Sequence, residues 1–257
     1  MTTARLLRMA PGAAFIAAVL ALVEYLVQAG HLRRALLPPP TVIWSTLWDL
    51  LASGAVLTPM LTTLALFVVG FLLATVLGVV LGGAMGTSRF VSDLLEPLVE
   101  TIRPIPKAAL VPVLMLFLGL GFEMKVTSTV LASFFPILIN TIQGVRGVDP
   151  VLIGTGRTFG RNRLAITLGI ILPAAVPYIV TGMRVGLGLA LLMTVLSEML
   201  AGTGGLGALI LENQRAFRIR QMYAWLVILA AFGFALNLAM TWAERRLVPW
   251  LEKHREV

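Results

Sequence analysis

The sequence predicts an all-α membrane protein, and two properties of the whole chain support this fold class. Of its 257 residues, 58% are hydrophobic and only 12% are charged, whereas soluble domains carry about 25% charged residues. Mean hydropathy is +0.95, which excludes an ordinary soluble domain. A chain embedded in lipid has to satisfy its backbone polar groups internally, so the apolar runs are expected to be helices. We expect one transmembrane domain over residues 1–257, with its core at about residues 57–246.

Six stretches are long enough, or nearly so, to cross a hydrocarbon core, which needs about 20 apolar residues. The predicted spans are Pro11–Ala29, Leu61–Met85, Ala108–Gly121, Val126–Gln143, Ala174–Met199 and Met222–Trp242. The first follows Arg5 and Arg8 and could imitate a signal peptide, but its apolar stretch is long, so we interpret it as an uncleaved span. The third is short, and the prolines near its start make its boundary the hardest to place.

The segment between the first two spans, His31–Met60, has the features of a helix that lies along the membrane surface. Three prolines precede Thr41, which we expect to cap the helix. Apolar residues then recur at spacings of three and four, at Trp44, Leu47, Trp48 and Leu51, and this pattern is typical of an amphipathic interfacial helix.

Small residues and prolines mark the following spans. Glycines recur along the second span, where they allow helix backbones to approach closely, and we interpret them as packing residues of the bundle. The tetrapeptide Arg103–Pro106 predicts a rigid break before the third span, and Pro136 predicts a break in the fourth.

Basic residues are distributed unevenly across these spans. If the N-terminus is cytoplasmic, thirteen basic residues lie inside, six lie outside and Arg184 lies within a span. The positive-inside rule therefore predicts that both termini are cytoplasmic, and the net charge of +8 reflects topology, not nucleic-acid binding. The six outer residues are Arg33, Arg34, Lys125, Arg215, Arg218 and Arg220.

A polar loop, Asp149–Pro173, lies between the fourth and fifth spans on the predicted cytoplasmic side. Asp149 is a good N-cap and Pro150 suits the first helical position, so a short helix should begin there. It should end near Gly160, which can adopt the left-handed conformation. From composition alone, a solvated loop that merely obeys the positive-inside rule is favoured over a docking element by about two to one, because basic cytoplasmic loops are the norm.

Four residues of this loop resemble the conserved cytoplasmic loop of binding-protein-dependent ABC importer permeases. In that family the loop reads Glu-Ala-Ala, three residues, Gly, nine residues, Ile, one residue and Leu-Pro. The matching residues here are Gly160, Ile170, Leu172 and Pro173, whereas Gly154, Thr155 and Gly156 stand at the Glu-Ala-Ala positions. The acidic residue that this loop usually offers is therefore absent. The Arg103–Pro106 tetrapeptide resembles the sequence just before the third span in permeases of the nitrate, sulfonate and taurine branch of this family.

The resemblance implies a type I (MetI-like) permease bundle of about six helices with a cytoplasmic coupling helix, in the bacterial inner membrane. It implies four partners besides membrane lipids: two copies of an ATP-binding cassette subunit, a second copy of this chain and an extracytoplasmic solute-binding protein. ATP would bind to the partner subunit and no cofactor to this chain. The expected ATPase-coupling residues are Gly154, Thr155, Gly156, Arg157, Phe159, Gly160 and Pro173.

Polar residues inside the predicted spans are candidates for the translocation pathway, because such residues are costly in lipid and usually face a bundle interior or a wet cavity. They are Asn140, Arg184, Ser197 and Glu198. Glu198 is the strongest candidate, and a structural ion pair or interfacial position explains it equally well. Arg184 lies nearer the cytoplasm, where its side chain can reach the interface.

Other kinds of chemistry find little support in the sequence. The run Gly202–Gly207 matches G-x-G-x-x-G but follows a span instead of a strand, so we interpret it as an external turn. No lysine follows a glycine, which excludes a Walker A loop, and no cysteine is present for a thiolate metal site. We expect no catalytic residue and no metal site. The alternative function is a self-sufficient secondary transporter that uses Glu24, Arg184 and Glu198 as an ion relay.

Overall fold

The computed structural model of the protein describes residues 3–247, and the regular elements in this range are all helical. In chain order they are α1 (Thr3–Gln28), α2 (Pro40–Ala52), α3 (Leu57–Thr87), α4 (Arg89–Ile102), α5 (Lys107–Leu118), α6 (Phe122–Arg146), α7 (Pro150–Thr158), α8 (Arg163–Ile166), a π-helical turn (Thr167–Ile171), α9 (Leu172–Ala201), α10 (Gly205–Arg215) and α11 (Ile219–Leu247). The expected all-α membrane fold is confirmed.

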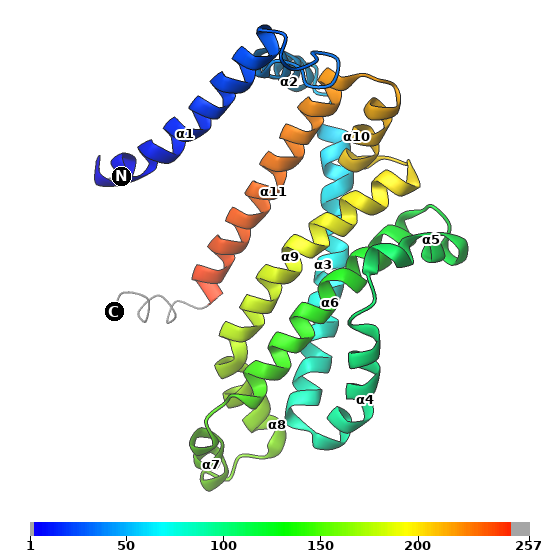
Figure 1. Ribbon diagram of the computed structural model, residues 1–257. Coiled ribbons are helices and arrows are strands. Elements are labelled where there is room, and N and C mark those ends of the chain that lie inside the picture. The colour runs from blue at the N-terminus through cyan, green and yellow to red at the C-terminus, as the bar shows by residue number, and fades with distance from the viewer. Residues whose placement is uncertain (1–2, 248–257) are drawn as a thin grey trace.

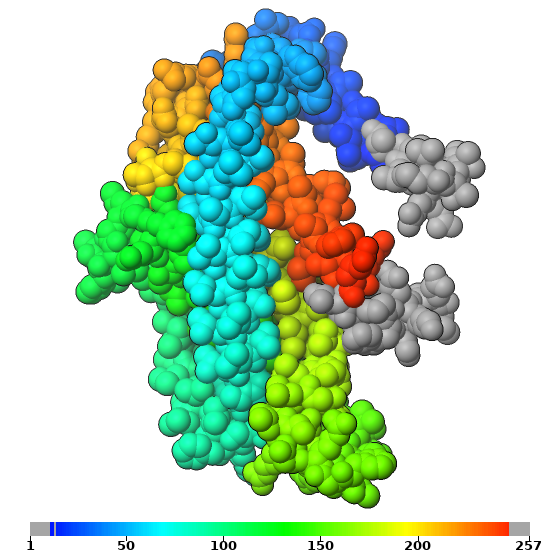
Figure 2. Space-filling model, turned by 180° about the vertical axis from the view of Figure 1, so that it is seen from behind, coloured from blue at the N-terminus to red at the C-terminus, as the bar shows by residue number. Residues whose placement is uncertain are grey.

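Helices α3, α6 and α9 form the centre of the bundle, with α6 packed against both of the others (Figure 1). Helices α2 and α10 lie at one end of the molecule, and α7 and α8 lie at the other. Figure 2 shows α3 running along the length of the opposite face, while α1 stands apart from the bundle beyond its contact with α2. The two ends are therefore built from short helices, and the long helices connect them.

Four helices are long and apolar enough to cross a membrane: Leu57–Thr87, Phe122–Arg146, Arg163–Ala201 and Ile219–Arg246. They correspond to the second, fourth, fifth and sixth predicted spans. The third span differs from the prediction, because α5 is only 12 residues long. It follows α4 after a bend of 96°, and only the two together are long and apolar enough for a broken span or a re-entrant loop. The first predicted span lies within α1, in which Ala14–Gln28 is an apolar stretch.

Glycines allow α3 and α6 to touch along their backbones. A Cβ atom at Gly70 would lie 2.7 Å from the Thr129 Cβ, and a Cβ at Gly82 would lie 2.8 Å from the backbone oxygen of Leu138. Side chains of any size are excluded at these contacts. This geometry is the close helix packing that small residues permit in membrane proteins.

Two local predictions were wrong. Helix α6 continues through Pro136. A proline removes one intrahelical donor, and in a membrane bundle neighbouring helices and side chains satisfy the backbone groups that it frees. Helix α2 begins at Pro40 with Pro39 as its N-cap. Thr41 instead donates from its amide and its hydroxyl to the Glu24 carboxylate, at 3.1 and 2.9 Å. The carboxylate from α1 thus caps α2 where we expected a threonine of α2 itself.

Candidate functional site: the α7 loop and the buried Glu198 cluster

The α7 helix has the start that the sequence predicts. The Asp149 side chain accepts a hydrogen bond from the Val151 amide at 2.8 Å, and Pro150 occupies the first turn, where its missing N–H leaves no bond unmade. These signals all lie within three residues of one another. The start of α7 is therefore set by residues that are neighbours in the sequence.

The end of α7 is a Schellman motif centred on Gly160. Gly160 has φ +70° and donates to the Arg157 carbonyl at 2.9 Å, and the Arg161 amide donates to the Gly156 carbonyl at 3.1 Å. Glycine is the favoured residue at this left-handed position. A Cβ at Gly160 would meet no atom within 4 Å, so the backbone conformation alone calls for glycine here.

Gly156 fixes α7 to the base of the long span. It is buried, and a Cβ added to it would lie 2.7 Å from Ile170 Cδ1 and 3.3 Å from Ile166 Cγ1. The apolar cluster around this contact includes Val145 and Val148 from the α6 end. The glycine that replaces the family's second alanine thus lets α7 approach α8 and the π-helical turn more closely than alanine would.

The other predicted coupling residues of α7 face outward. Gly154, Thr155 and Arg157 are exposed, and Phe159 has 80% of its surface accessible. Beside them lies a cavity of about 530 Å³ whose lining includes three arginines, Arg146, Arg157 and Arg163. The exposed surface around α7 therefore carries an aromatic ring and positive charge.

Pro173 does not end the loop as expected. The long helix begins ten residues earlier, at Arg163, and continues through a π-helical turn into α9. Asn162 caps this start, since its side chain accepts from the Ala165 amide at 2.8 Å. The wider π turn accommodates Pro173, which has no N–H for the usual bond. The contacts of α7 with α8 and the π-helical turn therefore fall on the start of one continuous span.

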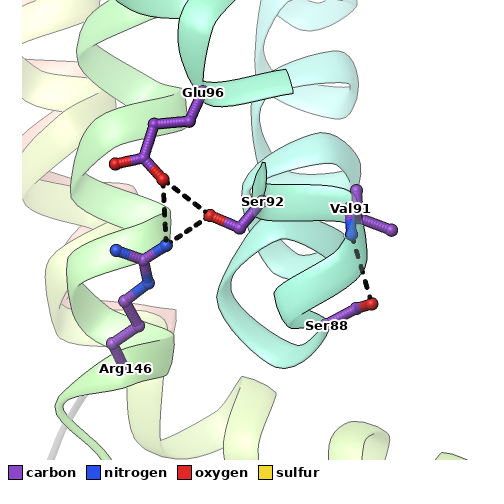
Figure 3. Close-up of polar contacts among 5 residues, drawn as sticks. All are labelled: Ser88, Val91, Ser92, Glu96 and Arg146. Carbon is purple, nitrogen blue, oxygen red and sulfur yellow. Dashed lines mark hydrogen bonds and ion pairs between the residues drawn. The ribbon is translucent and has the colours of Figure 1, made fainter. Parts of the chain in front are cut away.

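A polar contact ties α4 to the end of α6 near α7 (Figure 3). Arg146 donates to the Ser92 hydroxyl at 2.6 Å, and Ser92 donates to the Glu96 carboxylate at 2.9 Å. The ion pair between Arg146 and Glu96 is longer, at 3.9 Å, and both side chains are about half exposed. Ser92, with 3% exposure, is thus the buried link. Sequence reasoning missed α4, because its polar residues and Pro97 concealed the helix.

Glu198 is fully buried, and its carboxylate is bound entirely within the chain. It accepts from the Thr63 hydroxyl at 2.8 Å and from the Gly207 amide at 2.9 Å, while Thr63 also accepts from the Leu206 amide at 2.9 Å. These amides belong to the first turn of α10. A carboxylate next to unpaired amides at a helix N-terminus is strongly favoured. Glu198 therefore joins α3, α9 and α10.

Other buried polar groups surround this cluster. Lys125 of α6 donates from Nζ to the Thr203 carbonyl, and the Thr129 and Thr194 hydroxyls are 2.9 Å apart across α6 and α9. Ser197 is buried and donates to the Thr194 carbonyl at 2.8 Å. Among the residues that the structure describes, no buried side-chain nitrogen or oxygen lacks a partner. The cluster is thus internally satisfied.

The remaining pathway candidates lie apart from Glu198. Asn140 lines a cavity of about 360 Å³, and Arg103 and Lys107 line it as well. The sequence had not indicated these two basic residues as pathway candidates. Lys107 lies over the Phe135 ring at 4.4 Å. Arg184 forms an ion pair with Glu244 of α11. The four candidates therefore do not form one site, and their role in translocation stays a prediction.

Comparisons with known proteins identify the family to which the chain belongs. Residues 74–253 match the family described as "Binding-protein-dependent transport system inner membrane component". The chain is 35% identical over 167 residues to the taurine transport system permease protein TauC of Escherichia coli strain K12. The aligned residues make up 65% of this chain and 60% of TauC. The matched part thus spans less than two thirds of that relative. The riboflavin transport system permease protein RibX of Chloroflexus aurantiacus is 36% identical and covers 84% of this chain and 80% of RibX.

Solved structures share the fold. A structure of the MetNI methionine ABC transporter in an inward-facing conformation has a TM-score of 0.61 at 19% sequence identity, covering 72% of this chain and 92% of the matched one. An amino acid ABC transporter crystallised with histidines has a TM-score of 0.55 at 18% identity, covering 76% of this chain and 92% of its own. Together with the match over residues 74–253, these similarities show that the chain belongs to the family of binding-protein-dependent transport system inner membrane components.

Proposed function

We propose that this chain is the membrane-spanning permease subunit of an ATP-binding cassette importer. The observation that carries the proposal is α7: a capped helix with an exposed outer face, fixed by Gly156 to the base of the span Arg163–Ala201. A helix of this kind suits the transmission of force from a partner to the bundle. Family membership and the named transport relatives support the same function.

In this proposal, two ATP-binding subunits dock under two copies of the chain and hydrolyse ATP. Their closure displaces α7, and the displacement passes through the contact between Gly156 and Ile170 to α9. The bundle then changes between inward-open and outward-open arrangements, a rigid-body transition between two packed states. Phe159 and Arg157 are the contact residues that we assign to the ATP-binding subunit.

The proposed orientation places α7 in the cytoplasm and α2 and α10 outside, with both termini cytoplasmic in the bacterial inner membrane. This orientation puts most basic residues inside. It also exposes the end with α10 to an extracytoplasmic solute-binding protein. Since relatives are named for taurine, aliphatic sulfonates and riboflavin, we propose a small solute, such as a sulfonate or related organic molecule, as the transported substrate.

Gentle affinity purification from native membranes, followed by identification of bound proteins and an ATPase assay, tests the proposal. We expect an ATP-binding subunit in a ratio of one to one with this chain, and ATP hydrolysis that a solute-loaded binding protein stimulates. Uptake by the pure chain in proteoliposomes, driven by an ion gradient without ATP, would overturn the proposal in favour of a secondary transporter.

A further inference from the structure

The end of α10 is a second Schellman motif, but its left-handed residue is Phe217. Phe217 has φ +54° and is the one non-glycine residue with positive φ in residues 3–247. Its amide donates to the Gln214 carbonyl at 3.1 Å, and the Arg218 amide donates to the Asn213 carbonyl at 2.8 Å. The hydrogen bonds repeat those around Gly160 at the end of α7, residue for residue. One chain therefore builds the same helix end once with glycine and once with phenylalanine.

Phenylalanine at this position destabilises the chain itself. A residue with a Cβ is strained in the left-handed region, and a bulky side chain there is a genuine outlier. No packing offsets the strain, because 86% of Phe217 is exposed. Strained, exposed residues of this kind cluster at functional sites. The ring is thus displayed at a cost to the fold.

The surroundings of Phe217 are basic and concave. It borders a cavity of about 610 Å³ whose lining includes Arg34, Arg218 and Arg220, together with a single carboxylate, Asp49. The lining comes from the start of α11, the segment before α2 and α2 itself. Figure 1 shows these elements at one end of the molecule. Aromatic residues and arginine are enriched at protein–protein interfaces.

We propose that Phe217, Arg34, Arg218 and Arg220, here called the Phe217 surface, dock an acidic protein surface that has an apolar recess for the ring. The proposal rests on the proposed function, which places this end outside and identifies the partner as the solute-binding protein. Phe217 enters the recess, and the arginines pair with carboxylates around it. Desolvation of the ring on docking compensates for the strain that the free chain carries.

A protein partner fits this surface better than a membrane does. The Asp49 carboxylate on the cavity wall repels a lipid phosphate, whereas a protein surface can place a donor opposite it. The residues that suit a lipid interface lie on α2 instead, where Trp44 and Trp48 are about two-thirds exposed. The two surfaces therefore divide the outer end into a membrane-facing part and a protein-facing part.

The test uses the complex of this chain with its ATP-binding subunit in lipid nanodiscs, and the binding protein that stimulates the wild-type complex. We expect Phe217→Gly to raise the half-maximal binding-protein concentration by about tenfold or more, a loss of about 1.4 kcal/mol. Basal ATPase activity should not change, and the thermal midpoint should stay equal or rise, because glycine relieves the strain. Phe217→Trp keeps the ring and should retain wild-type stimulation. Arg218→Glu should weaken docking most at low salt.

Two outcomes overturn the inference. If Phe217→Gly and Arg218→Glu both leave the half-maximal concentration unchanged, the Phe217 surface does not dock the binding protein. If Phe217→Gly instead alters basal activity only in nanodiscs that contain phosphatidylglycerol, the surface is a membrane anchor. Failure of the proposed function gives a different result, since the wild-type chain would then bind no ATP-binding subunit and show no basal ATPase activity.

Discussion

The Glu198 carboxylate accepts a hydrogen bond from the Thr63 hydroxyl at 2.8 Å, although 135 positions separate the two residues. This contact joins α3 to α9 and, through the Gly207 amide, to the first turn of α10. A carboxylate bound on several sides in the bundle interior holds these helices in one arrangement. Its removal leaves buried donors without partners, and such donors are costly.

We therefore predict that Glu198→Ala lowers the free energy of unfolding by about 2–4 kcal/mol, seen as a lower thermal midpoint in detergent. Glu198→Gln keeps an acceptor oxygen and the shape of the side chain, so its loss should be smaller. A Glu198→Ala variant that is as stable as the wild type but inactive in transport would contradict the structural role and favour the pathway role.

Neighbouring glycines of α3 provide a matched pair for helix packing. Gly82→Ala would place its Cβ 2.8 Å from the backbone oxygen of Leu138, whereas the Cβ of Gly83→Ala would lie 3.8 Å from the nearest side-chain atom, Leu172 Cδ1. We predict that Gly82→Ala destabilises by about 1–3 kcal/mol through overpacking. Gly83→Ala should be neutral or stabilising by up to about 1 kcal/mol, since alanine favours helix. Equal thermal midpoints for the two variants would show that α3 and α6 are not in close contact.

The end of α7 depends on the backbone of Gly160, not on the space around it. Gly160→Leu forces a left-handed conformation on leucine at a cost of about 1–2 kcal/mol, so we expect the helix end to rearrange. Stimulation of ATPase activity by the loaded binding protein should then collapse while membrane insertion persists. Gly160→Asn should retain most of the stimulation, because asparagine tolerates the left-handed region.

Gly154→Ala is the control for this experiment. Gly154 lies within α7 and has open space around it, so alanine should strengthen the helix by about 0.5–1 kcal/mol and preserve stimulation. Unchanged stimulation in Gly160→Leu would show that α7 does not transmit force.

The link between α4 and α6 depends on Ser92 more than on the ion pair. Glu96 and Arg146 are about half exposed, so Glu96→Gln should cost at most about 1 kcal/mol. Ser92→Ala removes the buried hydroxyl that receives the Arg146 bond, and we expect α4 to become more mobile. The chain has no cysteine, so spin labels on cysteines introduced at Phe90 and Leu164 report the α4 position directly. A distance distribution as narrow as that of the control Asp93→Ala would refute this expectation.

Local signals made part of this structure predictable. The cap and first turn of α7 and its glycine end depend on residues within about ten positions of one another, and the sequence shows all of them: Asp149, Pro150 and Gly160. The bend at Arg103–Pro106 is also local. Composition was sufficient for the fold class, because lipid leaves a chain few ways to satisfy its backbone.

Other elements depend on distant residues and were missed or misplaced. Helix α10 begins at Gly205 without a capping side chain of its own, because Glu198 and Thr63 satisfy its first amides. Helix α2 likewise takes its cap from Glu24 of α1. A helix whose start is capped from another helix carries no local signal, so sequence reasoning read Gly202–Gly207 only as a turn.

The sequence by itself determined the all-helical membrane fold, the position of α7 and the residues that give α7 its ends. Only the tertiary structure decided that the long span begins at Arg163 and that Glu198 joins three helices. It also showed that Phe217 takes the left-handed conformation that Gly160 has at the end of α7. The physical reason is range. Turns and caps are set by neighbours along the chain, whereas buried polar contacts exist only once distant helices have packed. The left-handed Phe217 was missed for another reason, because a phenylalanine does not mark a position that normally takes glycine.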